Sequence, residues 1–387
     1  MLTQYNLTLP KVVYAGEGAL SHMTTILNQA EAKKVAVFTD KGISGAGLLE
    51  VPLEMIKAAG AAHFVLDELP VEPTCDEAQA VIDSFITSGA DFIVAVGGGS
   101  VMDIAKLASV VASGRYGVRD LLDNPALGKK GVSTLMIPTT AGTGSEATPN
   151  SIVAVPEKGV KVGIVNPDMV AEYVILDGSM IKKLPRKIAA STGVDALAHA
   201  IECFTSKKAN PFSDTFALEA LDIIINHIEE ACDNPEALQA KNKMLIAAFY
   251  AGIAITASGT TAVHALSYPL GGKYHIPHGV SNAMLLVPVM RFNEPACKER
   301  LAVAYDRVFK GEQRATTVEE KAAWIITRLD EIVKHLDIPT NLKDYGVGME
   351  AIDDLVKAGM EVQRLLQNNV REVTPEDARE IYRGLLQ

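Results

Sequence analysis

The chain has 387 residues, more than one hydrophobic core usually holds, and its 48% apolar and 21% charged residues are typical of a globular protein. Its net charge of −11, without any basic stripe, excludes a nucleic-acid surface built on clustered lysine and arginine. Four scattered cysteines without a CxxC pair exclude a disulfide framework and indicate a reduced, cytoplasmic protein.

The first half of the chain alternates β-rich apolar runs with segments of helical spacing. Strands are predicted over 33–40, 62–69, 91–99 and 133–140, and helices over 44–60, 76–89 and 100–114. This alternation predicts a Rossmann-like parallel sheet with helices on its faces. Such sheets bind ligands at the carboxyl ends of their strands.

From about residue 185 the pattern changes to long segments with helical spacing. Helices are predicted over 216–233, 244–257, 319–337, 349–367 and 373–386, the last with Thr374 as N-cap and Pro375 at the first helical position. Segment 244–257 is the most apolar, but it is too short to cross a bilayer and predicts a buried helix without membrane association. We therefore expect an α/β domain over 1–184 and an all-α domain over 185–387.

The segment AVGGGSVMDIAK (95–106) places Gly97, Gly98, Gly99 and Ser100 between a predicted strand and a predicted helix. Glycines let a ligand approach the backbone closely, and the free amides of a first helical turn attract an anion. The segment therefore predicts a pyrophosphate site. The alternative is a tight turn alone, because the pattern is neither GxGxxG nor followed by a Walker lysine.

A second loop, IPTTAGTGSEAT (137–148), leaves another predicted strand and offers the hydroxyls of Thr139, Thr140, Thr143 and Ser145. Two such loops favour a nucleotide site over a flexible surface loop. Asp40, at the end of the first predicted strand, can accept from both ribose hydroxyls and favours NAD over NADP. An aspartate that only caps a turn is the alternative. Because Asp40 precedes the glycines by more than one βαβ unit, we expect a strand order unlike the standard dinucleotide fold.

Asp195 and His199 lie four residues apart in STGVDALAHAIECF (191–204), where most other side chains are small or apolar. Residues with this spacing share a helix face, so one ion can bridge them. A carboxylate and a neutral imidazole suit a divalent metal. The alternative is a surface ion pair, but the apolar neighbours count against it because an unpartnered buried charge is costly.

Further metal ligands can come from VHALSYPLGGKYHIPHG (263–279), which contains His264 in a helical run and His275 and His278 in a predicted loop. Two of these three histidines would complete a set of four ligands. One carboxylate with several imidazoles and no thiolate accommodates Fe(II), Zn(II), Mn(II) or Co(II).

The motifs GGGSVMDIAK, IPTTAGTGSE, TGVDALAHAIE and HALSYPLGGKYHIPHG together resemble the iron-containing (group III) alcohol dehydrogenase family over essentially the whole chain. The resemblance implies a dinucleotide-binding α/β domain and a helical metal- and substrate-binding domain, an architecture shared with dehydroquinate synthase. It implies NAD-linked oxidation of small alcohols or diols, or aldehyde reduction, with Fe(II) or Zn(II). A homodimer or larger homo-oligomer is expected, with an N-terminal strand around residues 3–14 pairing across subunits.

The resemblance also assigns roles to individual residues. The implied metal ligands are Asp195, His199, His264 and His278, so the choice of His278 over His275 comes from the family. The implied cofactor residues are Asp40 at the ribose, Gly97, Gly98, Gly99, Ser100 and Asp103 at the pyrophosphate, and Thr139, Thr140, Thr143, Ser145 and Lys161 around them.

One position departs from the family pattern. Many members carry a second histidine four residues after the third ligand, often assigned to proton transfer, and this chain has Tyr268 there. A tyrosine relays a proton only if its pKa falls from about 10, so Tyr268 and His275 are both candidates. Three other functions stay open: a hydroxyacid–oxoacid transhydrogenase, a dehydroquinate-synthase-like lyase, for which Lys161 and Lys273 offer few cations, and a non-catalytic binding protein.

Overall fold

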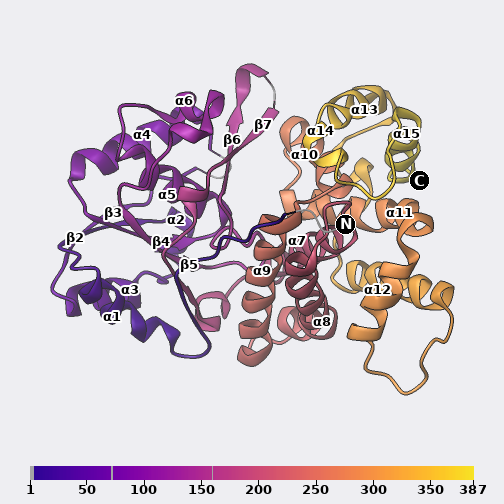
Figure 1. The fold of residues 1–387 in the computed structure, drawn as a ribbon, viewed down its shortest axis with the longest axis horizontal. Helices are drawn as coiled ribbons and strands as arrows, with labels where there is room; N and C mark the ends of the chain where they lie inside the picture. The colour runs from indigo at the N-terminus through magenta and orange to yellow at the C-terminus, as the bar shows by residue number, and fades with distance from the viewer. Residues whose placement is uncertain (1–3, 71–72, 159) are drawn as a thin grey trace. The chain divides into compact units, whose positions relative to one another are not determined.

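The computed structural model describes residues 4–70, 73–158 and 160–387 (Figure 1). They form two compact units, one of Thr8–Leu184 and one of Pro185–Gln387 together with the residues up to Leu7. The division thus falls between Leu184 and Pro185. Residues 4–7 belong to the helical unit, although the α/β domain was expected to begin at residue 1. In this segment the ring of Tyr5 packs edge-on against Phe212 of α8 (Pro211–Asp233), with ring centroids 5.3 Å apart.

A six-stranded sheet forms the centre of the N-terminal unit. Its strands run in the order β1-β8-β5-β4-β2-β3, and neighbours pair in parallel. Their bounds are β1 Val12–Ala15, β2 Lys34–Phe38, β3 Ala62–Leu66, β4 Phe92–Gly97, β5 Ser133–Pro138 and β8 Tyr173–Leu176. The predicted parallel sheet is confirmed, and its order differs from the standard dinucleotide fold as expected. Of the N-terminal strand expected around 3–14, residue 3 lies outside the described residues, and among residues 4–15 the strand is β1, Val12–Ala15, which pairs with β8 of the same chain.

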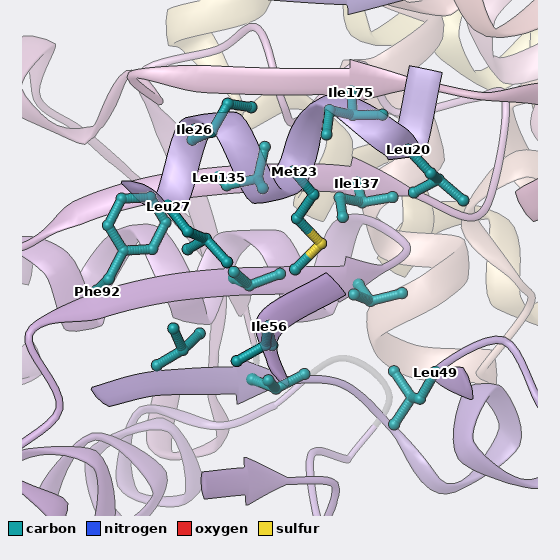
Figure 2. Close-up of a cluster of buried hydrophobic side chains, with 14 of the residues drawn as sticks. Leu20, Met23, Ile26, Leu27, Leu49, Ile56, Phe92, Leu135, Ile137 and Ile175 are labelled. Atoms are coloured by element: carbon teal, nitrogen blue, oxygen red, sulfur yellow. The ribbon is translucent and has the colours of Figure 1, made fainter. Parts of the chain in front are cut away.

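Helices cover both faces of this sheet, because successive strand residues point to opposite sides. The helices are α1 His22–Gln29, α2 Lys41–Gly45, α3 Glu50–Ala58, α4 Cys75–Ser88, α5 Gly99–Val111 and α6 Val118–Asp123. Met23 of α1 and Ile56 of α3 pack on Val37 and its neighbours on one face (Figure 2). Phe38 faces the other side, where its ring meets Phe85 of α4. The single helix expected over 44–60 is wrong, since the chain breaks at Gly47, whose φ of +74° suits glycine.

The strand order reverses at one point of the sheet. From β2 the chain moves outward to β3, then crosses back over β2 to β4 and continues through β5 in the opposite direction. The carboxyl ends of β2 and β4 therefore lie side by side where the direction reverses. Open α/β sheets bind ligands at such a point.

A two-stranded antiparallel hairpin, which was not anticipated, projects from this unit. It consists of β6 Asn150–Val155 and β7 Val160–Val165. Asp103 of α5 anchors it, because its backbone carbonyl accepts from Ser151 Oγ (3.0 Å) and its carboxylate accepts from the Ile152 amide (2.8 Å).

In the described part of the C-terminal unit, all regular secondary structure is helical. Its helices are α7 Arg186–Thr205, α8 Pro211–Asp233, α9 Leu238–Ser258, α10 Ala262–Tyr274, α11 His278–Val308, α12 Val318–His335, α13 Ile352–Met360, α14 Gln363–Leu366 and α15 Pro375–Gly384. The predicted start of the last helix is confirmed, since Thr374 caps it through a bond from the Asp377 amide to its hydroxyl. The single helix expected over 349–367 is wrong, because the chain breaks between α13 and α14.

The loop predicted around the last two histidines of 263–279 is also shorter than expected. Helix α10 continues through Pro269 and two glycines to Tyr274, and His278 already begins α11. Among the described residues, no single helix is long and apolar enough to cross a membrane. Helices α9 and α10 meet that criterion of length and composition only as a pair, across a 107° bend.

Candidate metal centre and nucleotide-binding edge

Four metal-ligating side chains of the helical unit converge on one point. Asp195 and His199 come from α7, His264 from α10 and His278 from α11, and one ligand atom from each lies within 4.8 Å of all the others. We call these four residues the Asp–His cluster. Three are buried, whereas the side chain of His278 is 35% exposed and marks the accessible side.

The local sequence explains how the helices present these side chains. The middle of α7 is buried and rich in small residues such as Ala196 and Ala200, and the spacing of four residues places Asp195 and His199 on one face of the helix. His264 lies in the first turn of α10 and His278 at the start of α11, so both are held at helix ends, where the chain changes direction.

The spacing of the ligand atoms fits a single divalent ion. Asp195 Oδ1 lies 3.7 Å from Nε2 of His199, 3.5 Å from Nε2 of His264 and 3.6 Å from Nε2 of His278. Ligands at about 2.1 Å from a tetrahedral ion are about 3.4 Å from one another. The donor set, one carboxylate oxygen and three imidazole nitrogens, therefore fits in both chemistry and dimensions.

Burial and mutual charge set the protonation of the cluster. Burial raises the pKa of Asp195, but the surrounding imidazoles outweigh it and hold that pKa well below its usual range. Burial lowers the pKa of His199 to about 4 despite the nearby Asp195. Burial also lowers the pKa of His264, but the carboxylates of Glu202 and Asp195 reverse this and raise it to about 9.

These protonation states leave the region with excess negative charge near neutral pH. Asp195 and Glu202 are both carboxylates, because their pKa values are lowered, and both act to raise the pKa of His264. His199 is neutral and has the lone pair that a metal ligand needs. A divalent cation would compensate the buried carboxylates, so the site is electrostatically suited to one.

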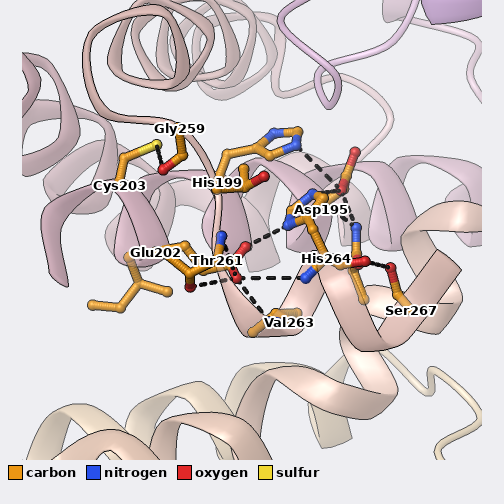
Figure 3. A network of polar contacts seen from close by, with 12 residues as sticks. Asp195, His199, Glu202, Cys203, Gly259, Thr261, Val263, His264 and Ser267 are labelled. Carbon is orange, nitrogen blue, oxygen red and sulfur yellow. Dashed lines mark hydrogen bonds and ion pairs between the residues drawn. The ribbon is translucent and has the colours of Figure 1, made fainter. Parts of the chain in front are cut away.

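Two buried residues at the cluster were missed by the sequence analysis. Glu202 contacts Nδ1 of His264 (Figure 3), and Asn282 Nδ2 donates to Asp195 Oδ1 at 2.6 Å and lies 3.1 Å from His264 Nε2. The Asn282 oxygen is buried without a hydrogen-bond partner. Helical spacing could have found both: Glu202 follows Asp195 by seven residues, and Asn282 follows His278 by four.

The two candidates for proton transfer lie outside the cluster. Tyr268 of α10 is half-buried, and its ring centroid is 6.1 Å from that of His278. His275 ends α10 in a left-handed conformation (φ 54°) with an exposed side chain. Of the two, Tyr268 is the one in ring contact with a member of the Asp–His cluster.

In the N-terminal unit, the predicted glycine loop lies at the reversal point of the sheet. Gly97 ends β4, Gly98 is the N-cap of α5 and supplies no side-chain cap, and Gly99 and Ser100 begin the helix. The first-turn amides of α5 thus have no side-chain acceptor from the N-cap, as an anion site requires.

The threonine loop, which we define as residues 139–145 of the predicted segment 137–148, lies against the glycine loop. The Thr139 amide donates to the Gly97 carbonyl at 3.0 Å, and Thr143 packs so closely on Gly99 that an added Cβ would lie 2.9 Å from its methyl group. The buried hydroxyls of Thr39, just after β2, and Thr139, just after β5, lack hydrogen-bond partners. These two strands flank β4, which ends in the glycine loop. Thr140, next to Gly98, is partly exposed. This edge therefore has unused polar groups for a ligand.

The remaining predicted cofactor residues differ in their surroundings. Asp40 follows β2 at the reversal point, where its carboxylate accepts from the Ile43 amide (2.9 Å) as the N-cap of α2. Asp103 is buried, accepts from the Ser145 hydroxyl and pairs with Lys106 at 3.0 Å. Its contacts hold Ser145 and the hairpin in place, so we expect it to act on a ligand through them. Lys161 lies on β7 of the hairpin, opposite Ala154 of β6.

Two family models of known proteins match this chain, one over each unit. Residues 10–178 match the family model described as iron-containing alcohol dehydrogenase, and residues 189–386 match that of the Fe-containing alcohol dehydrogenase family, C-terminal. The chain is 32% identical over 381 residues to long-chain-alcohol dehydrogenase 1 of Geobacillus thermodenitrificans, covering 97% of this chain and 95% of the relative.

Solved structures give the same result. A 1,3-propanediol oxidoreductase superposes with a TM-score of 0.94 at 27% identity, covering 99% of this chain and 100% of that one. Sulfoacetaldehyde reductase from Bifidobacterium kashiwanohense, solved in complex with NAD+, superposes with a TM-score of 0.88 at 28% identity, covering 100% and 99%. The chain therefore belongs to the iron-containing alcohol dehydrogenase family.

Proposed function

We propose that the protein is a metal-dependent, NAD-linked alcohol dehydrogenase or aldehyde reductase acting on small alcohols or diols. The observation that carries this proposal is the buried Asp–His cluster, whose chemistry and spacing fit one divalent ion. The family supports it, as do relatives named for propanediol and sulfoacetaldehyde. NAD rather than NADP is proposed because Asp40 would repel a 2′-phosphate.

In this proposal each region has a separate task. Asp195, His199, His264 and His278 would hold Fe(II), with Zn(II) as the alternative. When bound, such an ion stabilises negative charge on an alcohol or carbonyl oxygen, and NAD supplies the hydride acceptor. The amides of the glycine loop would bind the diphosphate, with hydroxyls of the threonine loop beside it and Lys161 as a further cofactor contact.

The proton of the substrate hydroxyl needs an acceptor in the same proposal. Tyr268 is the first candidate, because it is half-buried and in ring contact with His278, the exposed member of the cluster. His275 is the second candidate, from the solvent side. A Tyr268→Phe variant that keeps its metal and loses about 100-fold in turnover would identify Tyr268, since positioned acid–base groups contribute at least that much. His275→Ala measured in parallel tests the second candidate.

The test of the whole proposal is His264→Ala, compared with His63→Ala in β3 as a histidine outside the cluster. After anaerobic loading with Fe(II) or Zn(II), His264→Ala should lose both bound metal and NAD-linked alcohol oxidation, whereas His63→Ala should keep both. Retention of metal and activity in His264→Ala would refute the assignment. Turnover without added NAD would instead favour a transhydrogenase.

We also propose a cytoplasmic homodimer or larger homo-oligomer. The four cysteines are buried and unpaired, which suits a reducing compartment. Strand β1 is an edge of the six-stranded sheet and exposes Val13, and such edges are available for pairing with another chain. Light scattering of the purified protein tests this, and a monomer would contradict it.

A further inference from the structure

We propose that Glu202 is a positioning residue that fixes the ring tautomer of His264, so that Nε2 keeps the lone pair that faces the other ligands. The inference rests on the metal site of the proposed function. It concerns a residue of α7 that contributes no atom to the Asp–His cluster.

Glu202 is fully buried, and its two carboxylate oxygens have different partners (Figure 3). Oε1 accepts from the Thr261 amide (3.1 Å), the Thr261 hydroxyl (2.7 Å), the Val263 amide (2.8 Å) and, at 3.4 Å, the His264 amide. These groups form the start of α10, so Oε1 satisfies amides that a helix N-terminus leaves without an intrahelical acceptor. Among the residues that the structure describes, the one hydrogen-bond partner of Oε2 is Nδ1 of His264.

This division of contacts determines the tautomer. A carboxylate only accepts, so Nδ1 of His264 must carry a proton. A neutral imidazole has a single ring proton, which leaves Nε2 with its lone pair. That atom lies 3.5 Å from Asp195 Oδ1, on the side of the other ligands. Carboxylates that orient ligating histidines in this way commonly raise metal affinity.

The geometry also dictates what a Glu202→Gln variant must do. The three amides and the hydroxyl at the start of α10 all donate, so the glutamine oxygen must take the place of Oε1. Its NH2 group then faces His264 Nδ1, which has to accept. The ring proton moves to Nε2, and the lone pair is lost from the side of the ligands. A substitution that conserves shape is therefore expected to weaken metal binding specifically.

The test measures Zn(II) affinity by chelator competition and the tautomer by NMR of 15N-histidine-labelled protein. Glu202→Gln should bind Zn(II) about 10- to 100-fold more weakly, the range found when groups that orient ligands are removed. Its metal-free spectrum at high pH should show the proton of His264 on Nε2. The Zn(II)-loaded parent should show it on Nδ1.

Thr261→Val is the matched control, because it removes one donor to the same oxygen and weakens the start of α10 without touching His264. It should lower the melting temperature and keep the parent's Zn(II) affinity. An equal loss of affinity in both variants would overturn the inference, as would unchanged affinity in Glu202→Gln. If Glu202→Gln does not fold, a parent spectrum with Zn(II) on Nδ1 would overturn it just as directly. A parent that binds no Zn(II) at the cluster would refute the proposed function instead.

Discussion

Two buried aspartates, one in each unit, differ in the groups that stabilise their negative charge. Asp103 of the N-terminal unit has a permanent cation, the Lys106 ammonium at 3.0 Å, and also accepts from Ser145 and the Ile152 amide. Asp195 of the helical unit is surrounded by three imidazoles and the amide of Asn282. Its neighbours are ligands with their own lone pairs, not fixed cations.

The difference separates a structural charge from a functional one. A buried carboxylate that the chain neutralises by itself serves the architecture, here by anchoring the threonine loop and the hairpin to α5. A buried carboxylate that is surrounded mainly by neutral ligands is arranged for a charge from outside the chain. The comparison predicts that substituting Asp195 alters ligand binding, whereas disrupting the Asp103 pair alters stability.

The largest effect is expected for Asp195→Asn. With metal in 100-fold excess over its Kd, the parent should gain about 2.7 kcal/mol of stability, because the ion binds only the folded state. The variant should gain almost nothing and should lose turnover by at least about 100-fold, since ligand loss exceeds the loss of an orienting group. Thermal melts with metal and with chelator measure the gain. Equal stabilisation of both proteins would show that Asp195 is no ligand.

Lys106→Met should produce the largest loss of stability. Burial lowers the pKa of Lys106 against the opposing effect of Asp103, so the pair is held in a region where an unpartnered charge is costly. Removal of one partner of such a pair costs about 3–5 kcal/mol, which urea unfolding would detect.

The matched control for that variant is Lys41→Met, which breaks an exposed pair with Glu68 at 3.2 Å. Exposed pairs contribute about 0–1 kcal/mol, so this variant should unfold close to the parent. Metal affinity should be unchanged in both variants. If Lys106→Met lost metal affinity, the Asp103–Lys106 pair would not be purely structural, and the contrast with Asp195 would fail.

Glu146, the residue after Ser145, should make the stability of the folded protein depend on pH. Burial is the main cause that raises its pKa from 4.5 to about 7. The folded state thus holds a proton that the unfolded state releases, so this group's stabilisation is complete below pH 4.5 and is lost as the pH rises to about 7.

Glu146→Gln should remove that loss. Relative to the parent it should be about equally stable at pH 4 and more stable at pH 8, by up to about 3 kcal/mol, which is the pKa shift converted to free energy. Urea midpoints of the two proteins at both pH values measure the difference, and other groups cancel between them. If the difference in urea midpoint between the two proteins is the same at pH 4 and pH 8, Glu146 has an ordinary pKa.

The sequence predicted the parts of the molecule that depend on local pattern. Strand–helix alternation indicated the parallel sheet, and the spacing of Asp195 and His199 indicated a shared helix face, which the structure confirms. The break between α2 and α3 was missed because a positive φ at Gly47 leaves no mark in apolar periodicity.

Contacts between distant segments were beyond sequence reasoning. Glu202 accepts a hydrogen bond from the start of α10, about sixty residues later in the chain. The Lys106 ammonium on α5 donates to the carbonyl of Ser145 in the threonine loop at 2.9 Å. The choice between His275 and His278 depended on where α10 ends, which Pro269 obscured because it predicts an earlier break.

The smallest effect is expected at the glycine loop, where two neighbouring substitutions separate packing from ligand approach. A Cβ on Gly98 would make only an ordinary contact, 3.6 Å from Thr140, so Gly98→Ala should melt like the parent. A Cβ on Gly99 would lie 2.9 Å from Thr143, so Gly99→Ala should lower the melting temperature by displacing the threonine loop. If a diphosphate rests on these amides, Gly98→Ala should still bind NADH about 10-fold more weakly, equivalent to about 1.4 kcal/mol. Fluorescence titration measures this, and parental affinity in Gly98→Ala would place the diphosphate elsewhere on the sheet edge.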